Sequence, residues 1–150
     1  MHLVRRFFGF LSAEPLTPLE QSEVSSILEP PLAKAFFAQR IEDQRHAYSV
    51  KLRVGQRNGL YEAALLHDIG KTDSDLGALS RSLATVCNSF GVPTRGRWLD
   101  YLNHGEIGAH ELEMLGAGDL AVVFTRHHPG APPLGVEPGS WHLLERADNA

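Results

Sequence analysis

Cysteine occurs once in the 150 residues, at Cys87, so the chain cannot form an internal disulfide. A single thiol is typical of proteins that fold in a reducing compartment. Cys87 lies in a run with helical character, residues 83–87, which favours a small buried side chain over a nucleophile. We therefore expect a cytoplasmic protein in which Cys87 is structural.

Long apolar runs are missing as well. No segment approaches the roughly 18 consecutive apolar residues that a membrane-spanning helix needs. Arg5 and Arg6 precede an apolar run at residues 7–11, but this run is too short for the hydrophobic region of a signal peptide. We expect no membrane segment.

Charge of one sign is not concentrated anywhere. The chain has 14 basic and 18 acidic side chains, a net charge of −4, and no block of five or six like charges. This distribution does not favour binding to nucleic acid or to an acidic membrane. A small anionic substrate stays possible, because a bound divalent metal can outweigh the surrounding charge.

The apolar residues recur at helical spacing, with no strand alternation and no internal repeat, which predicts an all-α protein of one domain. Pro30 and Pro31 should stop the first helix before the second begins, and Gly70 should end the helix at 59–69 in a left-handed conformation. Asp119 and Ser140 are expected to cap the last two helices. The predicted helices span residues 18–28, 32–41, 38–54, 59–69, 76–90, 98–115 (with a break near Gly105), 119–128 and 140–148, and a loop is expected at 91–97.

Ionisable side chains stand where the apolar stripes of these helices end. His46, His67, His127 and Asp148 are all predicted to face the core. A single buried histidine is more often a hydrogen-bonded core residue than a ligand. Several together indicate a metal, because buried imidazoles and carboxylates need partners that offset their desolvation. Imidazole with carboxylate suits iron, manganese, nickel or zinc.

Four of the candidate ligands form two adjacent pairs, His67 with Asp68 and His127 with His128. Neighbouring helical residues point about 100° apart, so a pair can serve one centre only at a helix end or where two ions share the space. A glycine or proline soon follows each pair. This pattern favours a binuclear site in which Asp68 bridges two ions, since a carboxylate offers two oxygens.

The chain resembles the HD-domain metal-dependent phosphohydrolases, in the subgroup with a binuclear centre. The matching segments cover residues 40–150 and occur in the family's order: RHAYSV, LLHDIGK, NHGEIGAH, TRHHPG and LLERADNA. The resemblance implies a single HD-type helical bundle over residues 1–150, with packing helices in 1–37 and the metal-binding core in 38–150.

The resemblance also implies the ligands. One ion would be bound by His46, His67, Asp68 and Asp148, and the second by Asp68, His104, His127 and His128. The expected cofactors are two divalent ions, with Fe or Mn favoured and Ni, Co, Zn or Mg as alternatives. A hydroxide held between them would attack phosphorus in a small phosphorylated substrate, expected to be a nucleotide.

Cations near the ligands have two interpretations. Lys71 is carried over as a catalytic residue that contacts substrate phosphate, alongside Asp68, and is equally well explained as a cation at a helix C-terminus. Arg45 and Arg126 could bind phosphate, but we expect them to be solvated. His2, His110 and His142 are left outside the site, and Glu106 and Glu111 lie close enough to His104 for a supporting hydrogen bond.

The segment HHPGAPPLGVEPG departs from the family members that cleave cyclic di-GMP, because it lacks their Gly-Tyr-Pro signature. Two other functions remain open. Some relatives of this fold are di-iron oxygenases, and others are silent modules that bind a nucleotide or a partner. The complete ligand set ranks the silent module last. Oligomeric state cannot be inferred from the sequence.

Overall fold

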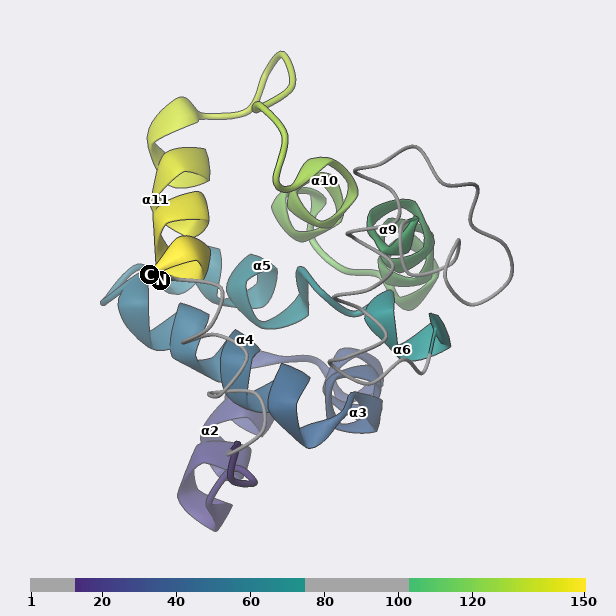
Figure 1. Cartoon of the computed structure of the whole chain (residues 1–150), viewed down its shortest axis with the longest axis vertical. Helices are drawn as coiled ribbons and strands as arrows, with labels where there is room; N and C mark the ends of the chain where they lie inside the picture. The colour runs from purple at the N-terminus through teal and green to yellow at the C-terminus, as the bar shows by residue number, and fades with distance from the viewer. Residues whose placement is uncertain (1–12, 75–102) are drawn as a thin grey trace, which may run out of the picture.

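The computed structural model describes residues 13–74 and 103–150, and every regular element in these two ranges is helical. Figure 1 shows them as a bundle. The predicted all-α class is confirmed. In chain order the elements are α2 (Pro18–Ile27), α3 (Pro30–Ala38), α4 (Ile41–Arg53), the 3-10 turn η1 (Asn58–Leu60), α5 (Tyr61–Leu66), α6 (Lys71–Ser74), α9 (His104–Leu115), α10 (Asp119–His127) and α11 (Pro138–Asn149).

The helix starts differ from the predicted ones at three places. Pro30 and Pro31 do not separate two helices; they are the first residues of α3, where proline's fixed φ and missing N–H are tolerated. The N-cap of α10 is Gly118 and not Asp119, which is already helical. The cap of α11 is provided by Glu137, whose carboxylate accepts from the N–H groups of Gly139 and Ser140.

Gly70 has a different role from the predicted one. It follows α5 in a buried turn of residues 67–70, but its φ is not positive, so it is no left-handed helix end. A Cβ added at Gly70 would lie 2.0 Å from the carbonyl oxygen of His104 and 2.6 Å from the amide nitrogen of Gly108. Glycine is required here because the turn touches the backbone of α9. The predicted break near Gly105 is also wrong, since α9 runs through it.

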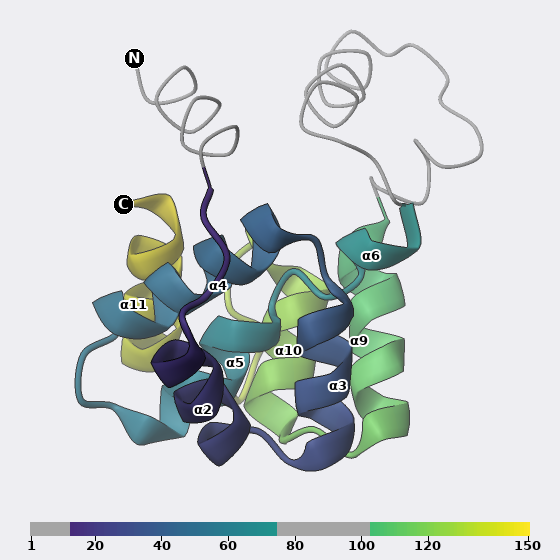
Figure 2. The same ribbon diagram turned by 90° about the horizontal axis from the view of Figure 1, so that it is seen from below.

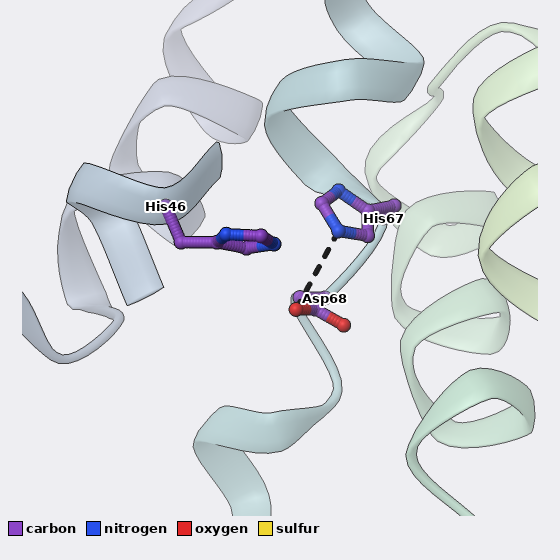
Figure 3. A group of neighbouring side chains, drawn as sticks. All are labelled: His46, His67 and Asp68. Carbon is purple, nitrogen blue, oxygen red and sulfur yellow. Dashed lines mark ion pairs between the residues drawn. The ribbon is translucent and has the colours of Figure 1, made fainter. Parts of the chain in front are cut away.

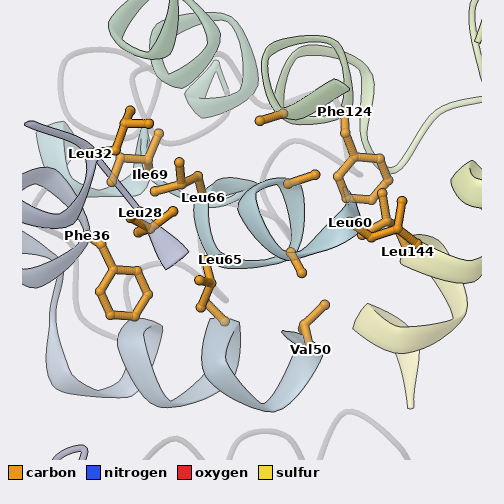
Figure 4. Close-up of a cluster of buried hydrophobic side chains, with 14 of the residues drawn as sticks. Leu28, Leu32, Phe36, Val50, Leu60, Leu65, Leu66, Ile69, Phe124 and Leu144 are labelled. Atoms are coloured by element: carbon orange, nitrogen blue, oxygen red, sulfur yellow. The ribbon is translucent and has the colours of Figure 1, made fainter. Parts of the chain in front are cut away.

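The short helix α5 lies at the centre of the core and packs against α4, α10 and α11. Ala64, Leu65 and Leu66 are completely buried. Figure 4 shows the cluster of apolar side chains that surrounds this helix, drawn from α2, α3, α4, α10 and α11: Leu28, Leu32, Phe36, Val50, Phe124 and Leu144 among others. The turn that carries His67 and Asp68 is thereby fixed from several sides.

The predicted helix at 76–90, the loop at 91–97 and the first residues of the helix at 98–115 lie outside the described residues, as do His2 and Cys87. Within the described ranges, no helix is long and apolar enough to cross a membrane.

Candidate metal centre

His67 and Asp68 stand on the turn that follows α5, and both are almost entirely buried. The turn is held by backbone bonds from Ile69 to Leu66 and from Lys71 to Asp68. Because α5 is enclosed by its neighbours, the two side chains project into a space bounded by protein and not into solvent. Figure 3 shows them facing His46, which comes from α4.

The two ring nitrogens of His67 have different surroundings. Nδ1 lies 3.0 Å from the carbonyl oxygen of Ala64, and since a carbonyl only accepts, Nδ1 carries a proton. Nε2 is buried and makes no hydrogen bond, yet it lies 3.5 Å from Asp68 Oδ2 and 3.4 Å from Asp148 Oδ1. In the neutral ring, a lone pair would therefore face two carboxylates. Only a proton or a metal ion at Nε2 makes this contact favourable.

Asp148, near the end of α11, joins three histidines. Its Oδ1 lies 2.7 Å from Nε2 of His46, and its Oδ2 lies 3.1 Å from Nε2 of His128. The sequence separates His46 and Asp148 by 102 positions. The predicted alignment of Trp141, Leu144 and Asp148 on the buried face of α11 is confirmed.

Asp68 faces two sides of the cluster. Its Oδ2 contacts His67 and forms an ion pair with the ammonium of Lys71, whereas its Oδ1 lies 3.7 Å from Nε2 of His104 on α9. The close contact at Gly70 brings α9 and this turn together. Asp68 is thus placed between His104 on one side and the His46–His67 group on the other.

In the ranges that the structure describes, two sets of side chains have donor atoms close enough to hold an ion. They are His46 with His67 and Asp68, and His67 with His128 and Asp148, and within each set the donor atoms lie within 4.8 Å of one another. His67 belongs to both sets. Neutral nitrogen and anionic oxygen donors suit Fe²⁺, Mn²⁺ or Zn²⁺. The bond from Nδ1 of His67 to a backbone carbonyl is the arrangement that orients a metal-binding histidine.

The electrostatics of the cluster also favour bound positive charge. Burial alone would raise the pKa of Asp68, but the Lys71 ammonium and the neighbouring imidazoles hold it well below the usual range. Burial would likewise raise the pKa of Asp148, but hydrogen bonds from His128 and His46 and the neighbouring imidazole of His67 hold that pKa well below the usual range. Burial acts to lower the pKa of His67, and the neighbouring carboxylates of Asp68 and Asp148 raise it instead. Both acids are therefore anionic ligands, and Nε2 of His67 attracts a cation.

Part of the cluster is exposed to solvent. The side chain of His67 is fully buried, whereas those of His46, His104 and Lys71 are 17%, 22% and 16% exposed. Among the described residues, these three provide the partly exposed part of the cluster. A small molecule that reaches Asp68 would meet them first.

His127 is not brought to the centre. It was predicted to end the buried stripe of α10 and to bind a second ion, but its side chain is exposed, whereas His128 is directed inward. The helix ends at His127 and the backbone of His128 is extended, so the buried stripe continues from Phe124 to His128. Phe124 stacks on the His128 ring with centroids 4.8 Å apart.

The remaining described histidines and the two arginines beside candidate ligands lie at the surface or in ion pairs. His110 and His142 are exposed. Arg126 is paired with Glu113 and Glu106 on the outer side of α9 and α10. Arg45, for which we expect solvation, is partly exposed, and its guanidinium is paired with Glu20.

Two supporting features were not predicted from the sequence: the Ala64 carbonyl bond to His67 and the Arg45–Glu20 pair. The bond to His67 has a sequence signal, because carbonyls in the last turn of a helix lack a helical partner and a histidine three residues on can reach one of them. No sequence pattern signals the second.

Comparisons with known proteins found no matching family model, no matching curated protein and no matching solved structure. The function is therefore argued from the residues of the site.

Proposed function

We propose that this chain is a metal-dependent phosphohydrolase whose centre is formed by His46, His67, Asp68, His104, His128 and Asp148. The observation that carries the proposal is the buried Nε2 atom of His67, which lacks a hydrogen bond and lies between the carboxylates of Asp68 and Asp148. A cation at that point would interact favourably with the nitrogen lone pair and with both carboxylates, which otherwise repel one another.

The chain offers donors for two ions, and the first ion has more of them than the second. His46, His67, Asp68, His128 and Asp148 would hold the first ion. His104, whose Nε2 lies 3.7 Å from Oδ1 of Asp68, would hold the second ion together with Asp68. This division differs from the one that the family resemblance implies, in which His127 and His128 both bind the second ion.

The proposed reaction is hydrolysis of a phosphoester or phosphoanhydride. Bound divalent ions would supply a water of lowered pKa and would offset negative charge on the phosphoryl oxygens. The bond between phosphorus and the leaving oxygen breaks, a bond from the water oxygen forms, and the leaving oxygen gains a proton.

Lys71 is the residue that we assign to substrate. Its ammonium is at Asp68, on the partly exposed side of the cluster, where it can exchange this carboxylate for a phosphate oxygen once metal neutralises Asp68. The substrate class, a small phosphorylated molecule and in particular a nucleotide, follows from this cation and from the resemblance of the LLHDIGK segment to the HD phosphohydrolases.

The test is a hydrolysis assay on protein purified without chelator. The protein is assayed with Mn²⁺ or Fe²⁺ against a chromogenic phosphodiester and a panel of nucleotides, and Asp68→Asn is assayed beside it with His110→Gln as control. The proposal predicts metal-dependent product release that is lost in Asp68→Asn and retained in His110→Gln, because His110 is exposed and outside the cluster.

Metal-loaded protein that hydrolyses none of these compounds would contradict the proposal. Oxygen uptake by a di-iron form that has no hydrolytic activity would assign the same cluster to an oxygenase.

A further inference from the structure

Arg45 immediately precedes His46 on α4, and its guanidinium makes four hydrogen bonds to the segment before α2 and to Glu20 in the first turn of α2. Nε donates to the carbonyl of Glu14 at 3.0 Å, and Nη2 donates to the carbonyl of Pro15 at 2.7 Å. The two terminal nitrogens also contact both carboxylate oxygens of Glu20, at 2.8 and 3.0 Å. Such a planar set of donors fixes orientation as well as distance.

Glu20 has a second task, at the start of α2. Its carboxylate accepts from the backbone N–H of Thr17 at 2.7 Å, while the Thr17 hydroxyl accepts from the N–H of Glu20. This is a complete capping box. Figure 2 shows the segment before α2 running past α4. The Glu20 carboxylate caps the start of α2 and also holds Arg45 on α4.

A second anchor joins the same two helices farther along. Glu23 forms an ion pair with the buried ammonium of Lys51 and accepts from the Tyr48 hydroxyl at 2.5 Å. With a rise of about 1.5 Å per residue, Arg45 lies about 1.5 Å from His46 along the axis of α4, whereas Tyr48 and Lys51 of the second anchor lie about 3 Å and about 7.5 Å away. The two anchors differ in their distance from the cluster.

We propose that the Arg45–Glu20 pair is a positioning device for His46. The pair fixes the N-terminal half of α4 at the place where His46 reaches Asp148 at 2.7 Å and its ring lies 5.5 Å from that of His67. A shift of this half-helix would move one metal ligand and leave His67 and Asp68 where they are. The inference rests on the proposed metal centre.

Two matched variants on α2 test it. Glu20→Gln keeps the capping box, which accepts glutamine, and removes the charge that holds Arg45. Glu23→Gln makes the same chemical change three residues on and removes the charge that holds Lys51. Mn²⁺ affinity, the absorption spectrum of the Co²⁺ form and the midpoint of thermal unfolding are measured for each.

We expect both variants to lower the thermal midpoint. Only Glu20→Gln should weaken Mn²⁺ binding, by about 10-fold or more, as is usual when the support of a metal ligand is removed, and only this variant should change the Co²⁺ spectrum. Arg45→Lys keeps the charge but not the planar donors, so its Mn²⁺ affinity should lie between those of wild type and Arg45→Ala.

Equal effects of the two glutamine variants on Mn²⁺ affinity, or no effect of Glu20→Gln, would overturn the inference. A wild-type protein that binds no metal would overturn the proposed function, and this inference with it. The two failures are distinguishable because the second is seen before any substitution is made.

Discussion

The two nitrogens of His67 define the chemistry of the site at the scale of the residue. Nδ1 is committed to the Ala64 carbonyl, so the ring cannot turn Nε2 away from Asp68 and Asp148. In the absence of metal, a proton must occupy Nε2, and the raised pKa of His67 agrees with this. A divalent ion would replace that proton, which is why metal affinity should rise with pH.

His127 and His128 provide the sharpest residue-scale prediction, because they are adjacent but differ in environment. His128→Ala should reduce metal affinity by at least about 10-fold, since the ring lies 3.1 Å from Asp148. His127→Ala should leave it unchanged, because that side chain is exposed. Equilibrium dialysis with Mn²⁺ measures both. A larger loss in His127→Ala would show that the loaded protein places His127 at the ions.

The sequence predicts part of this site and not the rest. The His67–Asp68 pair could be predicted because it ends an apolar stripe just before a glycine. The choice between His127 and His128 could not, since it depends on where α10 ends. The predicted buried face of α10, which included His127, is displaced by one residue in the structure. The observed buried face includes Ala121, Phe124 and Thr125.

The decisive contact at the scale of the element is between the turn at Gly70 and helix α9. Gly70→Ala would drive a Cβ into the backbone of His104 and Gly108, so we expect a loss of about 1–3 kcal/mol in the free energy of unfolding. Metal affinity should fall too, because Asp68 and His104 would separate. Denaturant unfolding and metal titration check the two effects.

Gly59→Ala is the matched control, because nothing lies within 4 Å of the Cβ that it adds and its φ is not positive. Its stability should stay within about 1 kcal/mol of wild type. If Gly70→Ala were equally harmless, the close contact between the turn and α9 would be wrong.

The anchor between α2 and α4 predicts a pH dependence. Hydrogen bonds from Arg45 and Thr17 lower the pKa of Glu20 from 4.5 to about 2. Because folding lowers this pKa, the stability it contributes is present above about pH 4.5 and is lost as the pH falls towards 2. The stability difference between wild type and Glu20→Gln should therefore shrink when the pH is lowered below about 4.5.

Urea unfolding of both proteins at several pH values measures this difference. A constant difference across the range would mean that Glu20 is not charged and paired in the folded protein. Sequence alone could not identify this anchor, because Arg45 and Glu20 are 25 positions apart and meet only when α2 docks on α4. The longer described helices were predictable, since each depends on local apolar spacing, whereas the short helix α6 has no such pattern and was not predicted.

At the scale of the whole molecule, the proposed ligands come from α4, the turn after α5, α9, the end of α10, and α11. A metal ion would connect all these elements and would bind only the folded chain. A free metal concentration of 100 times the dissociation constant should therefore stabilise the protein by about 2.7 kcal/mol. Thermal unfolding with Mn²⁺ and with chelator tests this, and identical midpoints would contradict it.

The most direct test of the account is the amount of metal bound per chain by wild type, His67→Gln and His110→Gln after equilibrium dialysis against Mn²⁺ or Fe²⁺. The account predicts at least one ion per chain in wild type and in His110→Gln, and loss of this ion in His67→Gln, whose Nε2 donor is gone. Wild-type protein that binds no ion, or His67→Gln that binds as much as wild type, would contradict it.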